Sequence, residues 1–281
     1  MTFVGSSDRV TAIDALLAVA RREILLLAIA VGALDDDGAA VACARLRWAI
    51  GVVRQLLGEL DDDDARSERL ARELDRIANH AQRWLIDEPP SSLSEVNGLA
   101  ERIAERRGWR TQAIAAEHAN LVDLDLDDLE LSRIALCGAR LTEITAQRAG
   151  WELADARSTR WERCRLEAAS LAMAVLSDST FEHCDLSCAN LEATSWSSAT
   201  LAHCALARAV LIDARLDRAV FTDCDLRGAD FEIARAPAAA ALAGTRFVRC
   251  DLRDTNWRGR DLAGATFVDC KLSSEQARQA P

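Results

Sequence analysis

The stretch 221–231, FTDCDLRGADF, contains the pattern that decides the fold. A large apolar residue stands at every fifth position (Phe221, Leu226, Phe231), and a small residue stands two positions before the next large one (Cys224, Ala229). The same stretch recurs every twenty residues, as WERCRL at 161, FEHCDL at 181 and LAHCAL at 201, and after a break as FVRCDL at 247 and FVDCKL at 267. Internal repeats take precedence over single motifs in deciding a fold.

A period of five fits neither the helical period of 3.6 nor the strand period of 2. It requires a chain that turns a corner every five residues and sends one large side chain inward on each side. Four sides then close a coil of twenty residues, so that each residue stacks on the one twenty positions later. The pattern predicts a solenoid of about seven coils, roughly 35 Å long at the ordinary spacing of paired strands.

Several copies of the five-residue unit share a further pattern: CDL at 184–186, ANL at 189–191, CDL at 224–226, ADF at 229–231 and CDL at 250–252. The pattern resembles that of the pentapeptide-repeat family, A(D/N)LXX. The resemblance implies a right-handed quadrilateral β-helix over residues 111–281. Some members of this family, the Qnr-type quinolone-resistance proteins, resemble a DNA duplex in size and charge and bind DNA gyrase.

The register of the repeat is broken once. The ladder of cysteines advances by 26 residues between Cys224 and Cys250 instead of 20. We therefore expect six inserted residues within 233–241, and Pro237 suits a loop that leaves the coil. Because outward loops assist partner binding in the resembled proteins, Arg235 and Pro237 are candidate contact residues.

Other departures from the repeat predict local changes in packing. Ala146 and Ala156 are small for inward centres, and the neighbouring Trp151 and Trp161 can refill the space. Arg260 in an inward small position predicts that the last coil opens. Large residues in the small position predict that the first coils are wider or less regular (Leu124, Leu129, Ile134, Ile144).

Residues 1–110 have helical periodicity instead. Helices are expected from Ser6 to about Leu34, over about 39–59, after the aspartates 61–64, and after Pro90, where Ser92 and Glu95 form a capping box. Four short-linked helices predict an antiparallel bundle. The fold class is thus α+β in two domains. The broad apolar face of the first helix leaves self-association open beside simple burial.

Composition limits the function. The formal net charge of −11 disfavours a protein that binds nucleic acid directly. Six of the nine cysteines occupy the small inward position, where Ala and Ser also occur, so we interpret them as buried apolar residues. With no predicted signal peptide and no apolar run long enough for a membrane span, we expect a cytoplasmic protein.

The candidate chemistry is sparse. His183-Cys184 and His203-Cys204 have the composition of metal ligands, but in the square coil Cys points inward while His lies outside, so the two should not converge. No phosphate-binding loop or Ser/His/Asp set occurs in the sequence. We therefore expect no enzyme activity, no metal and no cofactor.

Charge along one edge of the coil is the remaining signal. The edge beside the cysteine ladder has four bases (Arg163, Arg165, Arg249, Lys271) against ten acids. Two of these acids, Glu162 and Asp269, enter only the charge count. The other eight are candidate partner-binding residues: Asp123, Asp125, Glu143, Glu182, Asp185, Asp223, Asp225 and Asp251. The alternative is that Asp is simply favoured at the turns of the repeat.

Three functions remain open at this point. The first is a protein-binding module that mimics DNA and binds gyrase or another topoisomerase. The second is a scaffold or adaptor whose helical domain docks to a partner or forms homo-oligomers, an association that an end of the solenoid could also provide. The third is a secreted effector whose helical part directs it to its target.

Overall fold

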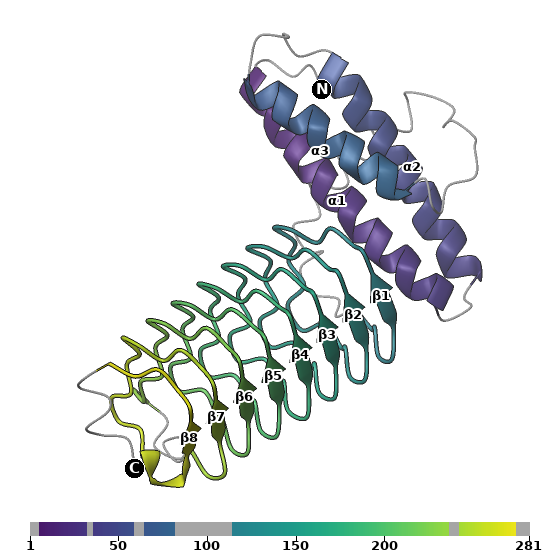
Figure 1. Ribbon diagram of the computed structural model, residues 1–281. Helices are drawn as coiled ribbons and strands as arrows, with labels where there is room; N and C mark the ends of the chain where they lie inside the picture. Colours follow the sequence, from purple (N-terminus) through teal and green to yellow (C-terminus); the bar gives the residue numbers. More distant parts are fainter. Residues whose placement is uncertain (1–5, 33–35, 59–64, 82–113, 236–241, 274–281) are drawn as a thin grey trace. The chain divides into compact units, whose positions relative to one another are not determined.

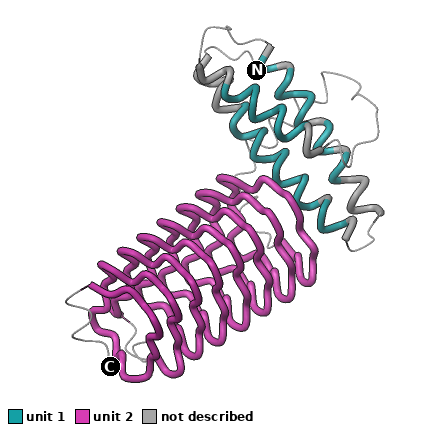
Figure 2. The backbone as a smooth tube through the Cα atoms, viewed as in Figure 1, with its two compact units in different colours: residues 1–112 teal, residues 113–281 magenta. Residues whose placement is uncertain are grey.

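The computed structural model describes residues 6–32, 36–58, 65–81, 114–235 and 242–273. The chain divides into two compact units, residues 1–112 and 113–281 (Figure 2). Each is described by itself.

The first unit contains three long helices, α1 (Ser6–Gly32), α2 (Asp36–Gly58) and α3 (Ala65–Ala81), as Figure 1 shows. Their apolar stripes form a common core, with Leu17, Leu25 and Leu46 almost fully buried. The three predicted helices up to residue 81 are confirmed. The expected fourth helix lies outside the described residues, and the antiparallel arrangement stays a prediction.

Two charged groups lie within this helical core. Arg21 on α1 forms an ion pair with Glu73 on α3. Glu23 is only 1% exposed and forms an ion pair with Arg45 at 3.7 Å. Among the described residues, its carboxylate oxygen Oε2 has no hydrogen-bond partner. Burial raises the pKa of Glu23, against the opposing effect of Arg45 and Arg22.

The second unit is a solenoid of stacked coils, with one short strand on the first side of each coil (Figure 1). All eight strands pair in parallel and in chain order. They are β1 (Asn120–Val122), β2 (Arg140–Thr142), β3 (Arg160–Glu162), β4 (Thr180–Glu182), β5 (Thr200–Ala202), β6 (Val220–Thr222), β7 (Arg246–Val248) and β8 (Thr266–Val268).

The other three sides pair coil to coil as well. Isolated parallel bridges join Asp125 to Thr145, Glu130 to Gly150 and Ala135 to Asp155, and repeat up the stack. In the first coil the four sides are 120–124, 125–129, 130–134 and 135–139, and we name the sides first to fourth in this order. The predicted twenty-residue coil is confirmed; its right-handedness stays a prediction.

The inward centres from Leu121 to Phe231 are buried as the period requires, and those of the last coil, such as Trp257 and Phe267, are partly exposed. The centres Trp161, Phe181, Leu201 and Phe221 are each 0% exposed. The refilling expected beside Ala146 is present, because Trp151 and Trp161 pack edge to face with ring centroids 5.6 Å apart. The large residues of the first coils are accommodated without loss of pairing, since β1 and β2 keep the twenty-residue offset (Asn120↔Arg140).

The corners of the coil have a left-handed backbone conformation. One residue on each side has φ between about +53° and +63° in almost every case, for example Asp223 at 53° and His203 at 54°. L residues adopt this region at a steric cost unless they are Gly, Asn or Asp. These corner side chains point outward, which places one column of side chains along each edge of the solenoid.

The insertion lies where the sequence predicts it. The pairing offset is 20 residues up to β6 and becomes 26 between β6 and β7 (Val220↔Arg246). Arg260, expected to mark an opening coil, does something different: its guanidinium donates to the carbonyl oxygens of Phe231 (2.7 Å) and Ala214 (2.8 Å). Both of these acceptors lie on the third side, close to the position at which the insertion begins.

Candidate functional site

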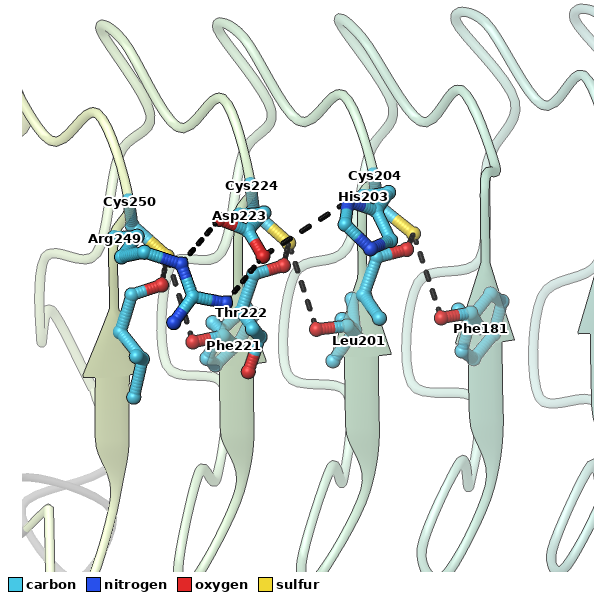
Figure 3. A network of polar contacts seen from close by, with 12 residues as sticks. Phe181, Leu201, His203, Cys204, Phe221, Thr222, Asp223, Cys224, Arg249 and Cys250 are labelled. Carbon is cyan, nitrogen blue, oxygen red and sulfur yellow. Dashed lines mark hydrogen bonds and ion pairs between the residues drawn. The ribbon is translucent and has the colours of Figure 1, made fainter.

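The outward columns of the β-helix are the candidate site, and the column beside the cysteines is shown in Figure 3. His183 and His203 stack on its surface with ring centroids 4.8 Å apart. His203 lies 4.0 Å from Asp223, which in turn forms a two-point ion pair with Arg249 at 2.6–2.7 Å. The hydrogen bonds from Arg249 lower the pKa of Asp223.

The cysteines lie on the inner side of the same strands. Cys204 is 2% exposed, while His203 is exposed. The Cys204 thiol donates to the carbonyl oxygens of Phe181 (3.6 Å) and Ala202 (3.2 Å), and Cys224 repeats this contact with Leu201 and Thr222 (Figure 3). The predicted divergence of His and Cys is confirmed. Within the described part of the chain, no three His, Cys, Asp or Glu side chains are grouped as metal ligands would be.

Most acids of the predicted edge are paired with arginine. Asp225 and Asp251 each form a two-point pair with the arginine two residues later, Arg227 and Arg253, at 2.7–2.9 Å. These hydrogen bonds lower the pKa of both carboxyl groups. Farther along the edge, Glu143 pairs with Arg163 at 3.0 Å, and Glu182 lies 3.4 Å from Arg160.

Three further acids of the edge, Asp125, Asp185 and Asp123, lie at turns of the main chain. Asp125 is 8% exposed and accepts hydrogen bonds from the Asp127 N–H (3.1 Å) and the Thr145 hydroxyl (3.4 Å). Asp185 accepts the N–H of Ser187 at 2.8 Å. Asp123 occupies a left-handed corner with φ 54°. These are the contacts expected of Asp at a turn, and they support the turn-preference alternative for this part of the edge.

Sequence reasoning counted Arg163 and Arg249 but missed Arg227 and Arg253, which also pair with acids of this edge. The signal was available as the spacing Asp-x-Arg, which occurs at Asp225-Leu-Arg227 and Asp251-Leu-Arg253, and also on the fourth side at Asp155-Ala-Arg157. The central residue of each triplet points inward, so the two flanking side chains lie together outside. The Asp155–Arg157 pair has the same geometry, at 2.7–2.8 Å.

One candidate loop residue lies within the described chain. Arg235 is exposed and pairs with Glu192 and, at 3.5 Å, with Asp213. Pro237 lies outside the described residues. Among the described helices, none combines the length and apolar character needed to cross a bilayer.

These features define a class of protein: a four-sided parallel β-solenoid with fixed outward columns of side chains. A family model described as pentapeptide repeats matches eight copies, at residues 162–195, 197–232 and 240–274. The solenoid of this chain therefore carries pentapeptide repeats over residues 162–274. No curated protein sequence matches it.

Solved structures with this fold include full-length QnrB1, a plasmid-mediated fluoroquinolone resistance protein, at 19% identity and TM-score 0.34, covering 60% of this chain and 96% of QnrB1. Another is HetL, a pentapeptide repeat protein involved in heterocyst differentiation regulation from the cyanobacterium Nostoc sp. strain PCC 7120. It has 22% identity and TM-score 0.16, covering 65% of this chain and 95% of HetL.

Proposed function

We propose that the protein is a non-enzymatic protein-interaction module in which the β-helix presents fixed rows of side chains to a protein partner. The observation that carries the proposal is the pairing between neighbouring coils, on all four sides up to Arg215 and on the first three sides beyond it, which holds outward side chains in register with those above and below them. A surface held in this way loses little conformational freedom on binding, which favours affinity.

The more specific form of the proposal is a DNA-mimicking contact with gyrase or another topoisomerase, which the family resemblance implies. Its support is the excess of acids over bases in the chain and the neighbouring aspartates on the second side. There the backbones of Asp225 and Asp251 pair in adjacent coils, so the two side chains stand in one column. Arg227 and Arg253 lower the negative potential there. A basic partner surface would have to displace these arginines from their carboxylates.

A supercoiling assay with the intact protein tests this form. We expect the wild type to inhibit gyrase or to protect it from a quinolone, and Asp225→Lys with Asp251→Lys to abolish the effect. Asp155→Lys is the matched control, because Asp155 makes the same pair with arginine on the fourth side. An inactive wild type, or equal loss in the control, contradicts gyrase binding through this edge.

The scaffold alternative rests on a different observation. The helical unit has a core of its own, formed by residues such as Leu17, Leu46 and Leu70, each 0–1% exposed. We propose that this unit docks or oligomerises while the β-helix presents a partner. Light scattering of the intact protein across a concentration series tests oligomerisation; a constant monomer mass leaves only docking to another protein.

A further inference from the structure

Two large apolar side chains lie exposed and adjacent on the third side of the β-helix. Leu153 is 44% exposed and Met173 is 52% exposed. They occupy the same corner in neighbouring coils, the coils that begin with β2 and β3 (Figure 1). The Leu153 N–H donates to the Ala172 carbonyl at 3.0 Å, which places the two corners side by side. Ala172, partly exposed, and Ala193, exposed, extend this apolar corner.

The fold gives no reason for these two residues. Both have a left-handed backbone, with φ 58° for Leu153 and 60° for Met173, a region that favours Gly, Asn and Asp. Among the described non-glycine residues with positive φ, the others are polar, charged or small. Leu153 and Met173 therefore accept an unfavourable backbone conformation and leave much of their apolar surface in water, so the core gains little from them.

Uncompensated acids flank the apolar corner. The carboxylates of Glu130 and Glu152 both lie over Gly150, each with an oxygen 2.9 Å from the position that a Cβ there would take. Glu152 accepts a hydrogen bond from Ser132 at 2.9 Å, and hydrogen bonds from Ser170 and Ser132 outweigh desolvation and lower its pKa. Neither glutamate forms an ion pair within the described part of the chain.

The third side as a whole is rich in acids. Its bases are Arg133, Arg258 and the inward Arg260, with Arg235 at the start of the insertion, and its acids are Glu130, Glu152, Glu192, Asp213, Asp230 and Glu232. Glu192 and Asp213 share an ion pair with Arg235, and Glu232 lies 3.8 Å from Arg258. The uncompensated negative charge next to the apolar corner is thus that of Glu130 and Glu152, with Arg133 in the same column as Leu153.

We propose that the apolar corner and these two glutamates form a docking site for a partner segment that carries a large apolar side chain next to an arginine or lysine. The apolar side chain covers Leu153 and Met173, whose flexible thioether adapts to its shape. The cation contacts the Glu130 and Glu152 carboxylates, which lie together over Gly150. This site rests on the proposed interaction function but lies on another side of the β-helix than the Asp edge.

A second copy of this chain fits the site less well. In a twofold contact the same patch would face itself. The Glu130 and Glu152 carboxylates of the two copies would then approach each other without cations, and like charges in contact oppose association. Charge complementarity therefore favours a basic and apolar segment of a different protein.

The test uses the intact protein as bait for a phage-displayed library of random peptides. We expect enriched peptides to place Arg or Lys next to Leu, Ile, Met or Phe. Calorimetry with the enriched peptide should show affinity falling about tenfold or more in Leu153→Ser with Met173→Ser. Glu152→Gln should weaken binding severalfold and reduce its dependence on salt, because a rim charge pair is lost.

Val122→Ser is the matched control, since Val122 is equally exposed, at 46%, but lies on the first side. It should bind the peptide as the wild type does, and circular dichroism should show that all variants keep their fold. The proposal is overturned if no peptide is enriched, if enriched peptides are acidic, or if the double variant binds unchanged. Self-association that disappears in the double variant would assign the surface to a second copy instead. The supercoiling result does not enter this test, so either proposal can fail alone.

Discussion

Arg260 donates to two carbonyl groups whose counterparts one coil earlier accept main-chain N–H groups, and the matching N–H groups here donate to Asp213. In the regular coil the N–H of residue 215 donates to the Thr194 carbonyl, and that of Ala214 to the Leu211 carbonyl. One coil later the corresponding donors are Ala234 and Arg235, and both donate to the Asp213 carboxylate at 2.9–3.1 Å. The corresponding carbonyls, those of Phe231 and Ala214, accept from Arg260. Among the described residues, one acid and one base thus take the places of the two partners in these ladder bonds where the insertion begins.

Removing Arg260 should therefore destabilise the β-helix. Arg260→Met keeps the length and apolar stem but removes the hydrogen bonds to the Phe231 and Ala214 carbonyls, and we expect a loss of about 3 kcal/mol of unfolding free energy. Denaturant unfolding followed by tryptophan fluorescence measures it. The control is Arg258→Met, whose side chain is 81% exposed, with an expected change within about 0.5 kcal/mol. Equal effects of the two substitutions would contradict the bridging role.

A missing hydroxyl beside Trp151 can be supplied. Trp161 and Trp196 each donate their indole N–H to the threonine two residues before, Thr159 and Thr194, at 2.8 Å. The residue two positions before Trp151 is Ala149, which has no hydroxyl. The buried indole nitrogen of Trp151 has no hydrogen-bond partner among the described residues.

Ala149→Thr should raise the unfolding free energy by about 1 kcal/mol, because it supplies the acceptor. Ala149→Val adds the same volume without the hydroxyl and should not stabilise the protein. Thermal unfolding of both variants measures the difference; if valine stabilises as much as threonine, packing is the cause and the hydrogen-bond explanation is wrong.

The buried Glu23 predicts a pH dependence of the helical unit. Because its pKa is raised in the folded state, the folded unit binds a proton more readily than the unfolded chain does. Stability should therefore fall as the pH rises from the ordinary value of 4.5 through the raised pKa, and stay lower above it.

Glu23→Gln should remove this contribution and raise the thermal midpoint at neutral pH. Thermal unfolding monitored by the helical circular dichroism signal at mildly acidic and neutral pH shows it. A variant whose midpoint keeps the slope of the wild type would show that Glu23 is not the group responsible.

The cysteine ladder should be chemically inert in the folded protein. Reaction needs access to the sulfur as well as the thiolate, and the ladder cysteines up to Cys250 are each 0–2% exposed. The hydrogen bond with Cys184 together with burial raises the pKa of Cys164, whereas hydrogen bonds with Cys204 and Cys250 lower that of Cys224, so the expected inertness of the ladder rests on burial. A thiol reagent followed by mass spectrometry should label the exposed Cys188 quickly. The buried cysteines Cys164, Cys184, Cys204, Cys224 and Cys250 should be labelled only as fast as the chain unfolds. Rapid labelling of Cys204 in a Cys188→Ser variant would contradict the packing role.

Much of the candidate surface could be predicted, but not its electrostatic state. The five-residue period correctly placed His203 and Asp223 outside and Cys204 and Cys224 inside. The count of charges on the edge omitted Arg227 and Arg253, because these lie two residues beyond each Asp and on the far side of an inward centre. Whether a carboxylate is free or paired depends on such short contacts, to which a count of net charge is insensitive.

The sequence alone determined the four-sided coil, its twenty-residue register and the site of the insertion, because each inward centre must stack on its copy in the next coil. Only the tertiary structure decided how the interrupted coil is closed and where apolar surface remains exposed. The hydrogen bonds of Asp213 and Arg260 with main-chain groups form only where the regular twenty-residue register is interrupted. The pairing of Leu153 with Met173 exists only because stacking brings residues twenty apart into contact. Local periodicity sets the repeat, and contacts between coils set what the repeat presents.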